Sequence, residues 1–239
     1  MYSIDKKVGF GDVGSDGRMN ISTIVDACQK CCGFQLDDNK VTQEFYERCN
    51  STTFLLFRQM DIFERPAYGQ NITIDTTVFE MKLAYGLRNT MIYDEDGNVM
   101  IASYVGGATV DKSTGKPVAY PKDLLERLKL GEKYEDMEYL PRKVRIPKGV
   151  EGEKLPDFPV YRYMIDENRH VNNAKYLDVA QEYVPEDFEI GRLRIAYMAP
   201  AKYGDIFHPV RYIYDDKVFL SLQDEEGNPY VNIELTEKA

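Results

Sequence analysis

The chain has 239 residues, of which 43% are hydrophobic and 29% are charged, and its formal net charge is −10 at pH 7. Such a chain is long enough to bury a sizeable core, and its negative charge disfavours nucleic acid and anionic lipid as partners. No stretch approaches the roughly 20 apolar residues of a membrane span, and the first residues have no apolar signal core. We therefore expect a soluble cytoplasmic protein that binds neither nucleic acid nor membrane.

The first predicted elements are a short strand at 6–10 and a helix that begins near residue 20. Three of the four cysteines, Cys28, Cys31 and Cys32, lie in this helix at the spacing of one apolar face, where cysteine behaves as a small hydrophobe. A zinc site would need a second pair of ligands at metal spacing, and only one cysteine remains. We expect reduced thiols in a core, no metal and no cofactor.

Runs rich in Thr, Ile, Val, Phe and Tyr follow the helix and predict strands. The tripeptides DGN at 96–98 and EGN at 226–228 have the composition of hairpin turns, because Gly and Asn tolerate positive φ. In the first half we expect strands at about 53–61, 71–84, 88–93 and 99–110.

A proline-containing segment, residues 115–157, separates two strand-rich halves. Within it, PKDLLERLKL (121–130) predicts one short helix, because proline opens it and an acid follows. The chain therefore divides into a first repeat (1–114), a linker (115–157) and a second repeat (158–239).

The second half repeats the first. DGRMNISTIVDACQ (16–29) aligns with NRHVNNAKYLDVAQ (168–181), with an identical Asn, Asp and Gln and the same apolar helix face. Two later turn segments match in the same order, so we infer an internal duplication. In the second copy we expect a strand at 160–164, a helix from about residue 173, and strands at 188–197, 206–214, 218–223 and 230–235. A helix followed by antiparallel strands, twice over, predicts an α+β protein.

The stretch DENRHVNNAKY (166–176) carries Asp166, Asn168 and His170 in alternation. In an extended segment these side chains share one face. Histidine can accept a proton near neutral pH, the acid can orient it, and the amide can hold a water or a carbonyl group.

The alternative is a polar turn without chemistry, because Asn172 and Asn173 are ordinary helix caps. The first copy keeps the same helix but has Gly14, Asp16 and Arg18 at the equivalent positions. The fold alone does not require the amide and the histidine, which favours the catalytic interpretation.

The duplicated order of strand, helix and antiparallel sheet, with DxNxHVNNxxY opening the second helix, resembles the acyl-ACP thioesterases. IDENRHVNNAKYLD carries most of the resemblance, DGRMNISTIVD and AKYGD support it, and it covers nearly the whole chain. It implies a tandem (double) hotdog fold, in which two antiparallel sheets each wrap a long helix and pack as a pseudo-dimer. It also implies a thioester hydrolase that releases fatty acid from fatty acyl-acyl carrier protein.

On this resemblance the second repeat is expected to be catalytic, with a water activated near Asn168 and His170 and with Asp166 orienting. The start of the helix near Asn173 would offer free N–H groups to the developing oxyanion. The first repeat would hold the acyl chain between helix and sheet. We expect these side chains to contact the substrate: Ile24, Cys28, Asn172, Asn173 and Tyr176.

One position departs from the family pattern. A glutamate usually follows the second helix in a segment resembling EYxxExxYGD, and here AYMAPAKYGD has Pro200. Three interpretations stay open: Asp166 and His170 suffice, another acid such as Glu182 or Asp205 replaces it, or the protein chiefly binds acyl chains. An acyl-CoA thioesterase is a further alternative.

Acyl carrier protein is itself acidic, so a chain of net charge −10 needs a local basic face to receive it. The segment PRKVRIPKG (141–149) has four bases and no acid. We predict carrier-protein contacts at Arg142, Lys143, Arg145 and Lys202.

Overall fold

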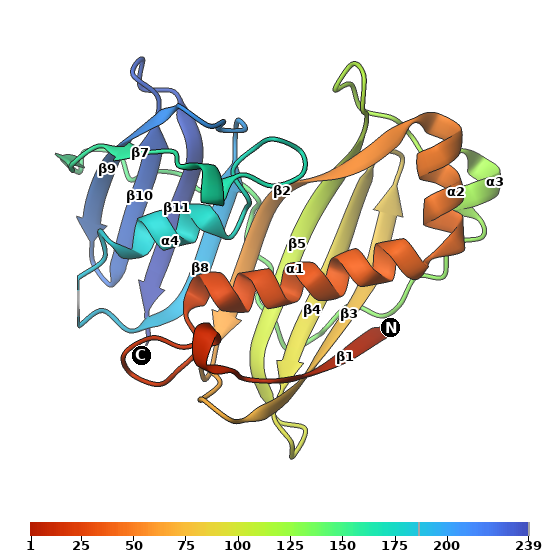
Figure 1. Ribbon diagram of the computed structural model, residues 1–239, viewed down its shortest axis with the longest axis horizontal. Coiled ribbons are helices and arrows are strands. Elements are labelled where there is room, and N and C mark those ends of the chain that lie inside the picture. Colours follow the sequence, from red (N-terminus) through yellow and green to blue (C-terminus); the bar gives the residue numbers. More distant parts are fainter. Residues whose placement is uncertain (186, 239) are drawn as a thin grey trace.

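The structure, a computed structural model, describes residues 1–185 and 187–238. Its centre is an antiparallel sheet in the order β1-β3-β4-β5-β2-β8-β11-β10-β9-β6, with β7 paired to β9 (Figure 1). The strands are β1 (Tyr2–Lys7), β2 (Ser51–Ile62), β3 (Asn71–Lys82), β4 (Tyr85–Tyr93), β5 (Val99–Asp111), β6 (Glu153–Lys154), β7 (Phe158–Pro159), β8 (Ile190–Tyr197), β9 (Ile206–Tyr214), β10 (Lys217–Gln223) and β11 (Pro229–Glu237).

The helices are α1 (Ile21–Asp38), α2 (Lys40–Cys49), α3 (Lys122–Leu125) and α4 (Lys175–Gln181), with short 3-10 turns at Phe10–Asp12 and Arg162–Met164. Helices α1 and α4 lie on the same face of the sheet, end to end along it (Figure 1). None of the helices in the described ranges has the length and apolar character that a membrane crossing requires.

The two halves join through one strand pair. Residues Phe57 to Asp61 of β2 pair antiparallel with Ala196 to Arg192 of β8. Arg192 reinforces this seam, because its Nε donates to Asp61 Oδ1 at 2.5 Å and its Nη1 to Glu138 Oε2 at 2.8 Å. The two halves therefore form one continuous sheet.

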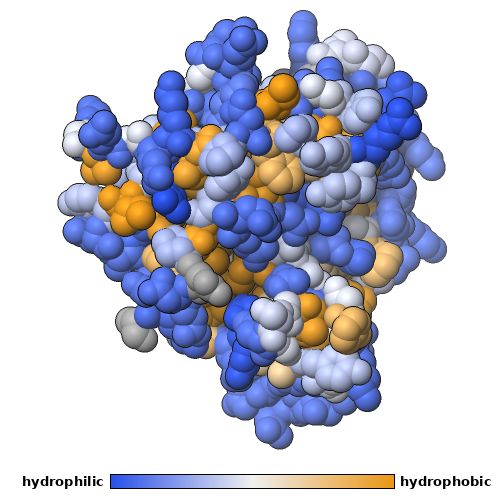
Figure 2. Space-filling view, turned by 60° about the vertical axis from the view of Figure 1, so that its left-hand side comes forward, coloured by the Kyte–Doolittle hydropathy of each residue, from blue (hydrophilic) through white to orange (hydrophobic). Residues whose placement is uncertain are grey.

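The helix stripe read from the sequence is the core contact of α1. Ile24, Val25, Cys28 and Cys31 are all buried, against strands of the first half and against residues of α4. On the surface shown in Figure 2, hydrophobic residues appear mostly in recesses between hydrophilic ones.

The duplication is visible in the backbone hydrogen bonds that precede helices α1 and α4. Equivalent pairs recur with nearly the same length: Asn20 N to Asp12 O (3.0 Å) and Asn172 N to Met164 O (2.8 Å), and Met19 N to Pro66 O and Val171 N to Ala201 O (both 2.8 Å). The two 3-10 turns also occupy equivalent places. The inferred repeat thus corresponds to repeated geometry.

Two expected strands are wrong. The first ends at Lys7 instead of reaching residue 10. In the expected strand at 160–164, residues 162–164 form a 3-10 turn that follows the two-residue strand β7. Proline at 159 has no N–H to donate to a ladder, and Met164 N bonds Tyr161 O at 3.1 Å, which closes a turn. Helix α4, at seven residues, is also much shorter than α1, which has 18.

The linker crosses the sheet face opposite the helices. Val144 packs in a cluster with Ala196 and Phe219, and Arg194 Nη2 donates to Pro141 O at 2.5 Å. The Gln59 side chain adds two bonds, from its Nε2 to Glu138 O and from Leu140 N to its Oε1. The short predicted helix is present as α3.

The β2–β8 strand pair should be sensitive to the removal of a buried side chain. Ile195 of β8 is 1% exposed and pairs with Arg58 of β2. Ile195→Ala should lower the free energy of unfolding by about 2–5 kcal/mol, measured by urea denaturation. Ile213→Ala, at a residue that is 54% exposed, is the matched control and should cost much less. Equal losses for the two variants would contradict the seam as a core element.

Candidate active site

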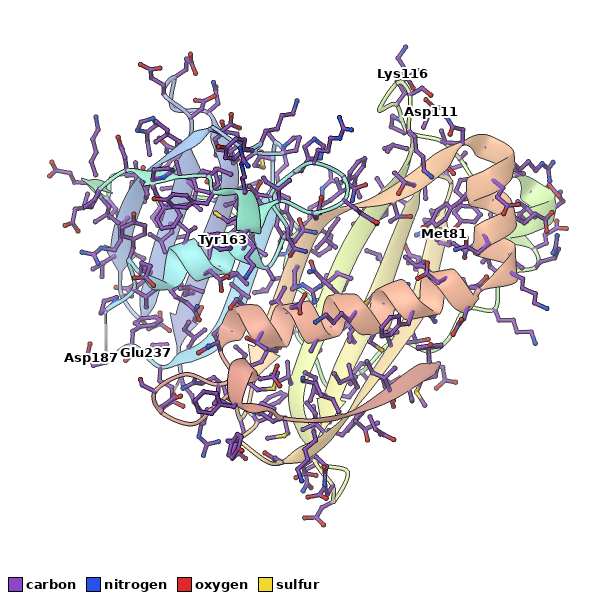
Figure 3. All side chains as sticks on the ribbon, viewed as in Figure 1. Met81, Asp111, Lys116, Tyr163, Asp187 and Glu237 are labelled. Atoms are coloured by element: carbon purple, nitrogen blue, oxygen red, sulfur yellow. The ribbon has the colours of Figure 1, made fainter. Side chains whose placement is uncertain are left out.

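A cavity of about 400 Å³ lies between α1 and strands β2 to β5 of the first half. The segment 128–130 completes its walls, and residues of the second half close one end: Asp166, Glu167, Asn168, Asn172 and Asn173. Figure 3 labels Met81, a wall residue at the α2 end, and Tyr163, which lies next to α4 near the opposite end. The DENRHVNNAKY stretch therefore meets the cavity across the boundary between the halves.

Glycine opens the floor of this cavity. Gly107 of β5 and Gly86 of β4 pair directly across the strands, and both line the cavity. A Cβ at Gly107 would come within 3.1 Å of Phe54 O, and one at Gly86 within 2.9 Å of Met81 Cε. Side chains at this pair would fill the space that the cavity uses.

The loop at the closing end is a small hairpin held by Asp166. Ile165 and Val171 form an isolated bridge, and Asp166 N donates to His170 O at 2.9 Å. The Asp166 Oδ1 accepts from the backbone N–H of Asn168 at 2.9 Å and of His170 at 3.5 Å. Asp166 thus fixes the backbone of the loop and does not contact the imidazole ring.

The structure brings Asp166 and Asn168 to the cavity and leaves His170 beside it. His170 is half-buried and is not a wall residue. Within the described residues its ring makes no hydrogen bond and no carboxylate lies within ion-pair distance, whereas His208 Nδ1 lies 2.8 Å from Asp157 Oδ1. The expected pairing of Asp166 with the ring is therefore absent from this arrangement.

Asn172 and Gln29 join the halves at the cavity. Gln29 Nε2 donates to Asn172 Oδ1 at 3.4 Å, and the same oxygen accepts from Ala174 N at 2.9 Å. Gln29 Oε1 is buried and has no partner in the part of the chain that the structure describes. Sequence reasoning treated Gln29 only as a repeat match, and its polar character on a largely buried helix was the available signal.

Two of the N–H groups at the start of the second helix are already bonded. Ala174 N bonds the Asn172 side chain, and Lys175 N donates to Asn172 O at 2.8 Å. Asn173 contributes its carbonyl, which accepts from Tyr197 Oη at 3.4 Å.

Three predicted substrate contacts lie in the core instead of on the cavity wall. Ile24 and Cys28 are 0% exposed and Tyr176 is 2% exposed, and none of them lines the cavity. Tyr176 Oη accepts from Ala201 N at 3.1 Å, and burial raises the pKa of this phenol to about 12. Tyr176 therefore ties the loop after β8 to α4.

The position of the absent glutamate and its two suggested substitutes lie outside the cavity wall. Pro200 is exposed, and the Asp205 carboxylate accepts from Lys202 N at 2.8 Å. Glu182 is likewise not a wall residue. The carboxylates that do line the cavity are Asp166 and Glu167, and the second was not anticipated.

The predicted basic residues fall on two different faces. Arg142, Lys143 and Arg145 belong to the linker segment that packs on the sheet face opposite the helices. Lys202 follows Ala201, whose carbonyl accepts from Val171 N, so it lies beside the DENRHVNNAKY stretch. No cluster of three or more potential metal ligands occurs in residues 1–185 and 187–238.

The cavity contains three further residues that were interpreted from the sequence as core or left aside: Cys32, Arg58 and Arg88. Burial would raise the pKa of the Cys32 thiol, but Arg88 and Arg58 together bring it below its usual value. For Cys28 and Cys31, burial raises the pKa to about 12.

These opposite shifts predict selective thiol labelling. The thiolate is the reactive form, so a lowered pKa gives Cys32 more thiolate at a given pH than its two neighbours. Iodoacetamide at pH 7.5 should modify Cys32 before Cys28 or Cys31, as followed by peptide mass spectrometry. Cys32→Ser provides the control, and modification of Cys28 ahead of Cys32 would contradict the assignment.

Arg169 predicts a local test of strain in the loop. Its φ is 62°, whereas the equivalent first-copy residue is Gly17 with φ 72°. Arg169→Gly should raise the free energy of unfolding by about 0.5–1 kcal/mol, because relief of the left-handed conformation outweighs the freedom of unfolded glycine. Gly17→Ala, with open space around its Cβ, should lower it by about 1 kcal/mol. A lower free energy of unfolding in Arg169→Gly would contradict this, because it would show that the Arg169 side chain stabilises the fold by more than the left-handed backbone costs.

Comparison with solved structures places the fold among thioesterases. An acyl-ACP thioesterase from Bacteroides thetaiotaomicron superposes with a TM-score of 0.81 at 17% identity, covering 99% of this chain and 97% of that one. An oleoyl thioesterase from Lactobacillus plantarum gives 0.82 at 18%, covering 100% and 97%. The 12:0-ACP thioesterase from Umbellularia californica gives 0.77 at 14%, covering 99% and 96%. These likenesses confirm the double hotdog fold.

At these low sequence identities, the solved structures show the fold, and family models show to which family the chain belongs. No curated protein sequence matches the chain. The acyl-ACP thioesterase N-terminal domain matches residues 1–128, and the acyl-ACP thioesterase C-terminal domain matches residues 148–232. The chain belongs to the acyl-ACP thioesterase family and is a thioester hydrolase of fatty acyl-ACP.

Proposed function

We propose that this chain hydrolyses fatty acyl-ACP at the closed end of the cavity, with the acyl chain inside the first repeat (1–114) and the reacting thioester at Asn168 of the second (158–239). The observation that carries the proposal is that the two repeats meet at the closed end of the cavity. The cavity walls come from one repeat, and Asp166, Asn168 and Asn172 come from the other.

Hydrolysis requires a positioned water, a proton acceptor and donors for the oxyanion that forms on the carbonyl. The water oxygen attacks the thioester carbon, the C–S bond breaks, and the leaving thiol takes up a proton. Asn168 lines the cavity with a free amide that can donate to the water or the carbonyl oxygen. Its backbone N–H is fixed by Asp166, so the amide is held at the cavity end.

His170 is the proposed proton acceptor. Its ring makes no hydrogen bond to the described residues, so it is free to turn toward a substrate, and catalytic hydrogen bonds often tighten only when substrate binds. Asp166 acts on it through the backbone. With Pro200 at the position of the family glutamate, we propose that Asp166 and His170 suffice without that carboxylate.

The carrier protein is proposed to approach the face that bears Lys202. This base lies beside the loop, whereas the three basic linker residues lie across the sheet from the cavity end. An acidic carrier would therefore bring its acyl group to the cavity along the helix side of the sheet. Lys202 gives this approach a local positive charge.

The two histidines of the chain offer a matched test. His170→Ala should lower kcat on acyl-ACP by about 100-fold or more, because a general base contributes 10²–10⁴ in rate. His208→Ala, which removes an imidazole paired with Asp157 outside the cavity, should leave kcat nearly unchanged. Release of free thiol from acyl-ACP and acyl-CoA measures both. Full activity in His170→Ala would refute the site assignment and spare the family, and turnover on acyl-CoA alone would refute the carrier.

Asn168 can be tested separately from the histidine. Asn168→Ala should lower kcat by about 10²–10³, the loss typical of one oxyanion or water-positioning donor, with little change in KM. Asn228→Ala, in the hairpin turn before β11, is the matched control. A change in KM alone would indicate that Asn168 only binds substrate.

A further inference from the structure

Two arginines stand in one row across the sheet beneath α1. Arg58 of β2 and Arg88 of β4 both pair with Val105 of β5, which lies between them, so the three side chains point to the same face. All three line the cavity. Since neighbouring strands are about 4.8 Å apart, the two arginine backbones are separated by roughly 10 Å.

Both guanidinium groups are buried without a carboxylate. Arg58 is 2% exposed and Arg88 is 8% exposed. Arg58 Nη1 donates to Ser103 Oγ at 2.9 Å, and its Nε has no partner among the described residues. Arg88 Nη1 donates to Thr76 Oγ1 at 3.0 Å and to Gln35 Oε1. Within the described residues no Asp or Glu oxygen lies within 4 Å of either group.

Other arginines of the sheet contrast with this pair. Arg192 Nε lies 2.5 Å from Asp61 Oδ1, and Arg194 Nη1 lies 2.6 Å from Glu234 Oε2. The half-buried arginines on β8 are therefore neutralised, and the two buried arginines in the cavity are not. Burial of an unpaired charge costs several kcal/mol, so two such charges in one cavity indicate an anion that enters from outside.

The surroundings of the pair are polar as well. Cys32 Sγ lies 3.4 Å from both Thr76 Oγ1 and Thr90 Oγ1. The lowered pKa of the Cys32 thiol agrees with a positive potential at this depth of the cavity. A plain methyl end of a saturated acyl chain would leave the two guanidinium charges without a counter-charge.

Contacts with α1 show how far Arg88 lies from the closed end of the cavity. Gln29 touches Asn172 at the closed end, and Gln35, which bonds Arg88, lies six residues further along the same helix, a rise of about 9 Å. Arg88 therefore lies beyond the thioester position by a distance that a medium-length acyl chain spans. Arg58, which is close enough to Cys28 to affect the pKa of its thiol, lies nearer the closed end.

We propose that the cavity selects acyl groups that carry a carboxylate at their far end, so that the preferred substrates are half-thioesters of dicarboxylic acids. The far carboxylate would lie between Arg58 and Arg88 and accept charge-assisted hydrogen bonds from both. This inference rests on the proposed function only for the position of the thioester.

The first test compares two acyl-ACP substrates of equal chain length, octanoyl-ACP and suberoyl-ACP, by release of free thiol. The intact chain should have the higher kcat/KM on suberoyl-ACP. Arg58→Gln and Arg88→Gln should each lower that value roughly tenfold or more, and leave or raise kcat/KM on octanoyl-ACP. Arg211→Gln, at an arginine of β9 outside the cavity, should change neither.

Two outcomes would overturn the inference. One is faster hydrolysis of octanoyl-ACP by the intact chain, with suberoyl-ACP left untouched. The other is an equal loss on both substrates in the two cavity variants together with a lower unfolding temperature, which would assign the arginines to the fold or to the thioester.

A binding measurement separates this inference from the proposed hydrolysis. Monomethyl suberate presents an ester and a carboxylate, whereas methyl octanoate presents the ester alone. The former should raise the unfolding temperature of the intact chain more than the latter, and the difference should vanish in Arg58→Gln and Arg88→Gln. If that result is found but no acyl-ACP is hydrolysed, the hydrolysis proposal fails and the anion site stands. Equal effects of the two esters, or no effect of either, would refute the anion site.

Discussion

The pairing of β2 with β8 is the constraint on which the rest of the structure depends. Each half alone would expose one edge strand with unpaired N–H and C=O groups. Antiparallel pairing of Phe57–Asp61 with Arg192–Ala196 satisfies both edges and fixes the register of one half against the other. Helices α1 and α4 are thereby brought into contact on one face, and Gln29 reaches Asn172.

Because the two halves belong to one chain, they are free to differ, and the structure shows how far they have diverged. The first half has an 18-residue helix and a cavity floored by paired glycines. The second half has a seven-residue helix, with Asn168 and His170 in a turn whose first-copy twin contains Asp16 and Arg18. One repeat therefore contributes the space, and the other contributes the polar groups at its closed end. A dimer of identical subunits would have to build both into every copy.

Periodicity was enough to predict most of the fold. Strands β2, β3, β9 and β10 begin or end within a few residues of their expected bounds, and the helix stripe through Cys28 is the core face of α1. Failures occur where a local effect overrides the pattern: Pro159 ends β7, and the turn at Met164 replaces a strand. The residue types at 160–164 do not indicate that turn.

The site was predicted less completely, because the spacing of residues in the sequence does not show which side chains reach the cavity and which lie in the core. Asp166 and Asn168 reach the cavity as alternation suggested, yet His170 lies beside it, since the hairpin closes between Asp166 and His170. Ile24 and Cys28 share the stripe with Cys32 but face the core. The pairing of Arg58 and Arg88 through Val105 depends on strand register, which no local pattern encodes. A charge inside the apolar run TFLLFRQM was the available signal for Arg58.

The seam also has a consequence for biosynthesis. Asp61 and Arg192, which meet there, are 131 residues apart in the sequence, so β2 is made long before its partner exists. During that interval an apolar strand waits with an open edge, which is the usual starting point of aggregation. Arg58 lies in the middle of that strand, where a charge acts as a gatekeeper against pairing with other chains. The charge of Arg58 disfavours such pairing before β8 is made, and in the folded protein the same side chain is part of the cavity wall.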